Sequence, residues 1–218
     1  MIDFLTFLIK KSIMAHMKRL FIFTLCLLGL VVFLWRETDG EKAETQAIFR
    51  MNLTAEPPTL DWSLATDNVS IRVIENLMEG LASYDEALRP QPAIAAGWDV
   101  SQEGRVYTFH LREDVFWSDG RQVTAHDFEY AWKRLLNPET ASEYAYFLYD
   151  IQNAAEYNAG KIKDASLVGV QALDDSTLRV NLKKQAVYFP SITTFTPTFP
   201  QRKDLIERYG DRWTAPEN

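Results

Sequence analysis

Cysteine is almost absent from this chain of 218 residues, and histidine is scarce. The single cysteine, Cys26, lies in an apolar stretch near the amino terminus, so the rest of the chain can form neither a disulfide nor a thiolate metal site. His110 and His126 have no histidine or cysteine four residues away, and they do not meet the standard spacings of zinc sites. The sequence therefore predicts no metal and no cofactor, and a fold held together by its core.

Motifs of catalysis are missing as well. The chain has no Gly-x-Ser-x-Gly nucleophile motif and no phosphate-binding loop. Two acidic pairs, Glu113-Asp114 and Asp174-Asp175, fall at predicted turns, where carboxylates are ordinarily solvated and do not act as an acid–base couple. We therefore expect that the protein is not an enzyme.

Positive charge is in short supply. The chain has 23 Lys and Arg against 30 Asp and Glu, and its net charge is −7 at pH 7. Five of the basic and three of the acidic residues lie in the first forty positions, which leaves −9 for the remainder. This balance argues against nucleic acid and anionic lipid as partners of the folded part. Hydrophobic residues make up 47% of the chain, which is ample for a packed core and excludes a disordered protein.

A single long apolar run, Leu20 to Trp35, follows the basic pair Lys18-Arg19. As a helix, its sixteen residues would span about 24 Å, which is short of the roughly 30 Å apolar core of a bilayer and slightly long for a signal peptide. Residues 1–40 are therefore predicted to be a signal peptide or a membrane anchor. In either case the basic flank stays in the cytoplasm and the rest is exported.

Two details of this segment leave alternatives open. Thr38-Asp39-Gly40 offers a weak small-x-small cleavage site, so both cleavage and retention as an anchor are considered. Cys26 could carry a lipid, but its leucine neighbours fit a lipid-attachment motif poorly, and an ordinary apolar residue is the simpler interpretation.

The most informative part of the chain runs from Val106 to Arg134. Tyr107, Phe109 and Leu111 alternate with their neighbours, which predicts a strand over 106–111 with one buried face. Ser118-Asp119-Gly120 is then typical of a tight turn.

A helix is predicted to follow this turn. Thr124 stands three residues before Asp127, which is the spacing of a capping box, and Asn137-Pro138 ends the helix. Trp117 and Trp132 are expected to pack in the core of this motif.

The remaining segments predict a mixed α and β protein. Strands are expected at 47–53, 167–173 and 177–182, helices at 68–81, 144–157 and 204–209, and a loop at 88–92. The first of these helices is predicted to be capped by Asp67 or Asn68, and Asp174-Asp175-Ser176 to close a hairpin.

The run from Val106 to Arg134 resembles the signature region of the extracytoplasmic solute-binding proteins of peptide ABC transporters. Other stretches match the same family in the same order, and they are found at 56–61, 79–81, 137–144, 170–178 and 209–214. The sequence Thr140-Ala141-Ser142, followed after one residue by Tyr144-Ala145, is most similar to the oligopeptide-binding branch.

The resemblance implies a mixed α/β fold of the bilobed periplasmic-binding-protein type, acting as a monomer. Members of the family are considerably longer, so we expect an amino-terminal portion that holds the first lobe and a small appended domain. In that division, residues 41–78 and 201–218 belong to the sheet-containing lobe, and residues 79–200 form the appended domain.

The resemblance also implies a function and a site. Two lobes would close on an extended peptide outside the cytoplasm and deliver it to an ABC permease in the membrane. The matching positions here are Tyr144, expected to line the cleft, and the stretch of Thr66, Asp67 and Asn68, expected to lend backbone groups. The oligopeptide binders have an acidic residue where this chain has Thr66, which leaves side-chain contact with a peptide amine open.

Other classes of function stay open. In the family, the groups that hold the charged ends of the peptide lie in the second lobe, so the alternative is a remnant or a membrane-anchored interaction module without tight ligand binding. A hydrolase acting on peptides finds no nucleophile in the sequence to support it.

The basic flank and apolar run make export testable. Residues 17–60, fused to a reporter that is active only outside the cytoplasm, should produce active reporter, because Lys18-Arg19 should hold the amino terminus inside the cell. The size of the product then separates cleavage from anchoring. A reporter that stays soluble in the cytoplasm would contradict the prediction.

Overall fold

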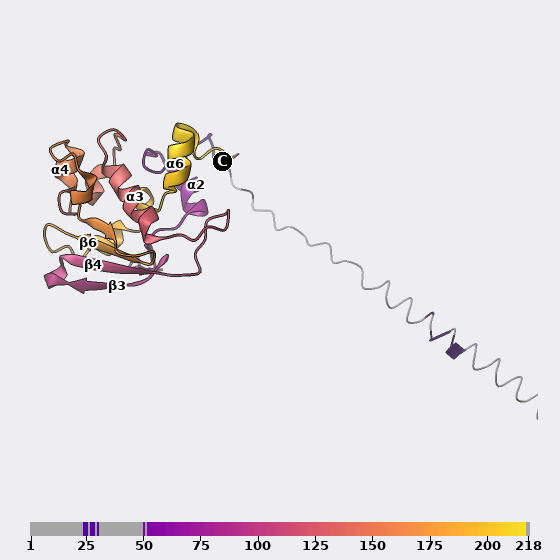
Figure 1. Cartoon of the computed structure of the whole chain (residues 1–218). Coiled ribbons are helices and arrows are strands. Elements are labelled where there is room, and N and C mark those ends of the chain that lie inside the picture. The colour runs from indigo at the N-terminus through magenta and orange to yellow at the C-terminus, as the bar shows by residue number, and fades with distance from the viewer. Residues whose placement is uncertain (1–23, 26, 29, 31–49, 51, 217–218) are drawn as a thin grey trace, which may run out of the picture. The chain divides into compact units, whose positions relative to one another are not determined.

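The computed structural model describes residues 24, 25, 27, 28, 30, 50 and 52–216. The chain divides into two units, Met1–Asn52 and Leu53–Asn218, and the second contains the sheets and helices discussed below (Figure 1). In the first unit, all five described positions between 24 and 30 are helical. None of the helices in the described part is long and apolar enough to cross a membrane. The apolar run Leu20 to Trp35 and Cys26 lie largely or wholly outside the described residues.

A four-stranded antiparallel sheet forms the base of the second unit, with the strand order β3-β4-β6-β5. Its strands are β3 (Ala95–Ser101), β4 (Val106–Leu111), β5 (Val170–Ala172) and β6 (Thr177–Asn181). Helix α3 (Ala125–Leu136) packs against β5 and β6, and Figure 1 shows it across one face of the sheet. The predicted strand over 106–111 and the hairpin between β5 and β6 are both confirmed.

Alternation along β4 explains how the sheet and the helix share a core. Tyr107 and Phe109 are buried, whereas His110 is exposed. Trp132 of α3 is completely buried, and its indole nitrogen donates to the carbonyl oxygen of Thr198 at 2.8 Å. Phe189 joins these aromatic side chains, with its ring centroid 6.1 Å from that of Trp132. Core packing of Trp132 is therefore as the sequence predicts, and Trp117 is half-buried against the same cluster.

The capping box at the start of α3 forms as predicted. The Asp127 carboxylate, itself buried, accepts hydrogen bonds from the backbone N–H of Thr124 at 3.0 Å and from the indole N–H of Trp117 at 3.3 Å. Its second oxygen accepts from Arg121 at 2.9 Å. Because buried carboxylates need such partners, Asp127 ties the tight turn to the helix that follows it.

The other elements are short. They are α2 (Asn68–Leu77), β1 (Ala82–Tyr84), β2 (Pro90–Pro92), α4 (Ala154–Asn158), α5 (Phe189–Ile192), α6 (Lys203–Tyr209) and several 3₁₀ turns. The helix predicted at 204–209 is confirmed as α6, and Gly210 ends it.

Several predicted elements differ from the structure. The segment 88–92 is not only a loop, since Pro90–Pro92 pairs with Ala82–Tyr84 as a two-stranded ribbon. The segment 144–157 is not one helix, because Ile151 forms a bridge with Leu182 and Asn153 adopts a left-handed conformation between a 3₁₀ turn and α4.

The third difference is the helix predicted at 68–81, which ends at Leu77 because Met78 is extended. Gly80 then passes so close to the carbonyl oxygen of Thr193 that a Cβ atom would lie 2.5 Å from it. Glycine is needed here for this close approach and not as a helix cap. Of the strand predicted at 47–53, residues 47–49 and 51 lie outside the described part, and the described positions 50, 52 and 53 are not in a strand.

Buried hydrophobic residues fall into two clusters. The larger one contains the sheet and α3, and its members lie between Leu81 and Phe189. The smaller one consists of Trp62, Ala65, Ile74, Phe199 and Trp213, with partly buried neighbours from the same segments and from α6. The smaller cluster thus joins the segment before Gly80 to the end of the chain, and it brings α2 and α6 together (Figure 1). The two parts expected from the resemblance stay a prediction, and Phe199, which that division places in the appended domain, belongs to the smaller cluster.

A buried ion pair connects the two clusters. Arg134 of α3 donates to both carboxylate oxygens of Asp61, at 2.9 and 2.6 Å, and both side chains are largely buried. The amide of Gln201 contacts Asp61 at 3.4 Å and donates to the hydroxyl of Ser63 at 3.0 Å. The pair therefore holds the segment that begins at Asp61 against α3.

Replacing Arg134 by methionine should leave the Asp61 carboxylate buried without its charged partner. We expect the free energy of unfolding to fall by about 3–5 kcal/mol, as for other broken buried pairs. Urea unfolding monitored by tryptophan fluorescence measures this change. The matched control is Lys203→Met, which breaks an exposed pair with Glu207 and should cost less than about 1 kcal/mol. Equal losses in the two variants would show that the Arg134–Asp61 pair has no special role.

Candidate functional site

The structure brings together two of the residues that the sequence predicts in the site. The hydroxyl of Tyr144 donates to the backbone carbonyl oxygen of Thr66 at 3.3 Å, across 78 positions of sequence. Thr66 is exposed and Tyr144 is half-buried, so the contact lies at the surface of the unit. Thr66 follows Ala65 of the smaller cluster, and Tyr144 directly precedes the 3₁₀ turn Ala145–Leu148.

Aromatic side chains fix the ring of Tyr144. Phe195 and Phe147 make edge-on contacts with it, with centroid distances of 5.1 and 5.8 Å, and Tyr146 lies 6.5 Å away. Edge-on packing of this kind stabilises one orientation of a ring. The phenol is thus presented to Thr66 in a fixed direction, and one face of this aromatic cluster remains open because Tyr146 is exposed.

Asp67 has a structural task of its own. It is the N-cap of α2, and one of its carboxylate oxygens accepts from the backbone N–H groups of Val69 and Ser70, both at 2.9 Å. Its hydrogen bonds from Ser70, followed by those from Val69, hold the pKa of Asp67 below its ordinary value of 3.8. The predicted helix cap is therefore Asp67 and not Asn68, which is the exposed first residue of α2.

The four predicted site residues thus lie in one region, although in different roles. Thr66 offers its backbone, Asp67 holds the helix, Asn68 is exposed and Tyr144 packs over the segment. A role for these residues in contacting a ligand stays a prediction.

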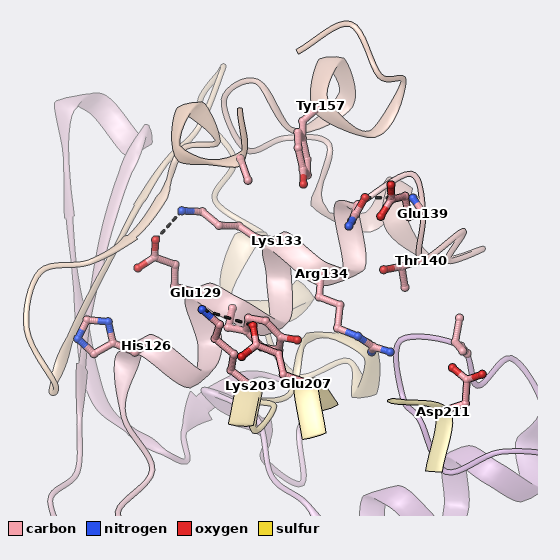
Figure 2. A pocket seen from close by; sticks show the side chains of 14 residues that line it. His126, Glu129, Lys133, Arg134, Glu139, Thr140, Tyr157, Lys203, Glu207 and Asp211 are labelled. Carbon is pink, nitrogen blue, oxygen red and sulfur yellow. Dashed lines mark hydrogen bonds and ion pairs between the residues drawn. The ribbon is translucent and has the colours of Figure 1, made fainter. Parts of the chain in front are cut away.

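Sequence reasoning missed a hollow on the outward face of α3 (Figure 2). Its volume is about 780 Å³, and its lining comes mainly from α3, α6 and the turn after α3. Leu64 and Thr140 line it as well, and each lies within four positions of a predicted site residue. The polar residues of α3 that line it recur every three or four positions, which is the one signal in the sequence for this face.

Metal chemistry finds no support in the described part of the chain, where no cluster of three or more His, Cys, Asp or Glu side chains could hold an ion. His110 contacts Asp99 at 2.8 Å, and His126 lies 3.5 Å from Asp175. Both pairs are exposed.

Comparison with known proteins gives the family. Residues 89–217 match the model of the bacterial extracellular solute-binding proteins, family 5, described as its middle part. This match covers more than half of the chain, and the protein therefore belongs to that family.

Curated relatives share the same class. The chain is 40% identical over 178 residues to the periplasmic oligopeptide-binding protein OppA of Salmonella typhimurium, and 39% identical over 175 residues to the probable deoxycholate-binding periplasmic protein YgiS of Escherichia coli. The alignments cover 81% and 79% of this chain but only 32% of each relative. These relatives are solute-binding proteins and not enzymes.

Solved structures show the same fold. Haemophilus influenzae OppA in complex with the peptide RPPGFSPFR aligns with a TM-score of 0.72 and 37% identity, over 77% of this chain and 33% of that one. The substrate-binding domain of an oligopeptide ABC transporter from Bacillus anthracis aligns with a TM-score of 0.70 and 41% identity, over 72% of this chain and 30% of that one. The mixed α/β fold of the periplasmic-binding-protein type is thus shown, and the chain corresponds to about a third of these proteins.

The N-cap at Asp67 has a measurable consequence for pH. Because the pKa of Asp67 is lowered in the folded state, its contribution to stability is present above its ordinary pKa of 3.8 and is lost as the pH falls through the lower folded value. In an NMR titration, the Asp67 carboxyl should therefore have a midpoint below 3.8. The amide signals of Val69 and Ser70 should shift with the same midpoint, and a midpoint at or above 3.8 would contradict the cap.

Proposed function

We propose that this chain forms one side of the peptide-binding site of an extracytoplasmic solute-binding protein that delivers peptides to an ABC permease. The observation that carries the proposal is the contact between Tyr144 and Thr66 in a chain that belongs to this family. It gathers the positions matched to the peptide cleft in one exposed place. The names of the relatives support peptides as the ligand class.

The geometry favours recognition through the backbone of the ligand. The Thr66 side chain cannot ionise, and the Asp67 carboxylate caps α2 through one of its oxygens, so this stretch has no charged group without a structural role. An extended peptide could instead pair with exposed backbone beside Thr66 and pack against the aromatic cluster around Tyr144. Hydrogen bonds to the main chain of a peptide give affinity that does not depend on its side chains. Such a site would therefore accept many sequences.

The location and partners follow from the same proposal. The relatives are named periplasmic, which supports export of this chain by its basic and apolar amino-terminal segment. The surplus of acidic residues in the exported part suits a protein that works free of nucleic acid and anionic lipid. The permease would be its membrane partner, and we expect it to act as a monomer.

The two hydrophobic clusters support the proposed division into parts. The smaller cluster would belong to the lobe that carries Thr66, and the larger one to the appended domain that carries Tyr144. The Tyr144–Thr66 contact would then lie where these parts meet, close to the buried Arg134–Asp61 pair that joins them.

A second candidate is an interaction module without tight ligand binding. It is favoured by the uncharged side chain at Thr66 and by the capping role of Asp67, since a peptide's charged ends would then be held by residues elsewhere. The two candidates differ in whether added peptide binds at all when the remaining two thirds of the family fold are supplied.

Calorimetry with mixed short peptides separates the candidates. The 218-residue chain alone should bind at best weakly, because hydrogen bonds in a half-open site compete with water and yield only about 0.5–1.5 kcal/mol each. Supplying a second lobe from a relative should produce tight, sequence-tolerant binding. Micromolar or tighter affinity of the chain alone would contradict the incomplete site, and no binding with the second lobe would favour the interaction module.

Two variants test the residues of the site in the protein with the second lobe. Tyr144→Ala should weaken peptide binding at least about tenfold without unfolding the protein, because the half-buried aromatic ring and its hydrogen bond to Thr66 are lost. Tyr144→Phe removes only the hydroxyl that meets Thr66 and should have a smaller effect. Tyr84→Ala, at an exposed tyrosine on β1, is the matched control and should leave the affinity unchanged.

A further inference from the structure

Tyr146 extends the aromatic cluster around Tyr144 towards solvent. Its side chain is 55% exposed, and its ring stacks on that of Phe147 with a centroid distance of 4.5 Å and an interplanar angle of 29°. The ring of Phe147 lies 4.7 Å from that of Phe195, which comes from a distant segment. Exposed hydrophobic side chains that occur singly are common, whereas a contiguous patch of them marks an interaction site. Tyr146 belongs to such a patch, because the other three residues of the cluster are only half-buried.

A short 3₁₀ turn, Ala145–Leu148, leaves Tyr146 on the solvent side. Residues three positions apart lie on the same side of such a turn, and Ala145 and Leu148 are both buried. The N–H group of Tyr149 donates to the carbonyl oxygen of Tyr146 at 3.1 Å, which fixes the backbone at this residue. Because the ring of Tyr146 is already held in place by its neighbours, contact with a ligand requires little further ordering.

The exposed ring lies beside the predicted peptide site. Its centroid is 6.5 Å from that of Tyr144, whose hydroxyl donates to the backbone carbonyl oxygen of Thr66. An extended peptide that pairs with backbone beside Thr66 would therefore have a side chain within reach of Tyr146. Successive side chains of an extended chain point to opposite sides, so alternate positions of such a peptide face the aromatic cluster.

The chemistry of the cluster favours one class of side chain. In the described part of the chain, the arginines that lie over aromatic rings are Arg202, over Trp117, and Arg208, over Tyr209, so neither covers the cluster. A cation at an exposed ring gains less than one at a desolvated ring. Stacked or edge-on contacts between rings are favourable beyond the burial of apolar area alone, and the cluster itself is built from such contacts. An aromatic group therefore fits the exposed ring best.

We propose that Tyr146 contacts an aromatic side chain of the bound peptide and gives the site a preference for peptides that carry one. The ring of the ligand would pack on the exposed side of Tyr146 and continue the stack with Phe147. This inference rests on the proposed peptide-binding function and adds a specificity to it. Main-chain hydrogen bonds would still admit many sequences, and the aromatic contact would rank them.

NMR titration of the full-length, ¹⁵N-labelled chain tests the preference. The probes are three tripeptides with both ends blocked, which have alanine at both outer positions and phenylalanine, leucine or arginine at the centre. We expect the phenylalanine peptide to shift the backbone amide signals of Tyr146 and Phe147. Its dissociation constant should be roughly two- to tenfold lower than those of the other two, as expected for one contact between rings.

Each other result of this titration would overturn the proposal. Equal binding of the leucine peptide would show that apolar burial alone is recognised. Equal or tighter binding of the arginine peptide would identify a cation as the preferred group. Absence of shifts at Tyr146 and Phe147 with the phenylalanine peptide would show that the exposed ring binds no such side chain.

Variants assign the preference to the ring of Tyr146. Tyr146→Ser should bind the three peptides with equal affinity and remain folded, because the side chain is exposed. Tyr146→Phe keeps the ring and should keep the preference for phenylalanine. Tyr84→Ser removes an exposed tyrosine on β1 and is the matched control, which should behave as the native chain does. An unchanged preference in Tyr146→Ser would overturn the proposal.

A protein supplied with the second lobe of a relative separates this inference from the proposed function. Calorimetry with the same tripeptides, now with free ends, should show tight binding of all three and the tightest for phenylalanine. Tight binding without a preference would overturn the role of Tyr146 and leave the peptide-binding function in place. If none of the three binds, the proposed function fails, and the specificity falls with it.

Discussion

The relation between the two hydrophobic clusters depends on one buried ion pair. Arg134 reaches from α3 to Asp61 with two short hydrogen bonds, and the pair is almost shielded from water. Transfer of two charges from water to the protein interior raises the free energy. Their mutual attraction offsets this penalty only when the geometry is good and the remaining lone pairs are hydrogen-bonded. Gln201 contributes here, because it contacts the same carboxylate from the segment just before α6. Three distant segments are thereby fixed in one arrangement, and the position of Thr66 follows from it.

A second, more exposed network holds α6 to the turn before α3. Arg202 bonds to Asp119 at 2.7 Å and to both oxygens of Asp204, and Arg121 bridges Asp204 to the buried Asp127. Hydrogen bonds from Arg202, with the further charge of Arg121, hold the pKa of the Asp204 carboxyl well below its usual range. The turn between the strand and the helix of the signature region is therefore supported both by α3 and by a segment more than eighty positions away.

Local patterns in the sequence predicted local structure well. The strand at 106–111 and the capped helix α3 follow from alternation and from the Thr124–Asp127 spacing, which act over a few residues. The prediction of one helix at 144–157 was wrong because Ile151 forms a β-bridge with Leu182, which is distant in the sequence. The residue pattern of one segment does not reveal its pairing with another segment.

The site shows the same limit. The family resemblance indicated Tyr144 and the stretch at Thr66, but the hydrogen bond between them joins residues 78 positions apart. The hollow on α3 was missed for a related reason. Its lining is assembled from five stretches of chain, which come together only in the folded structure.

The two edge strands of the main sheet are protected in different ways. The register of β3 shifts between Ala95 and Gly97, and such a bulge twists an edge away from a flat partner. At the opposite edge, a carboxylate oxygen of Glu129 accepts the backbone N–H of Ala172 in β5 at 2.8 Å. A strand from another molecule would therefore pair poorly with β3, which is bent by the bulge, and with β5, where the N–H of Ala172 is already hydrogen-bonded. The small sheet is thereby protected against intermolecular β-pairing at both of its edges.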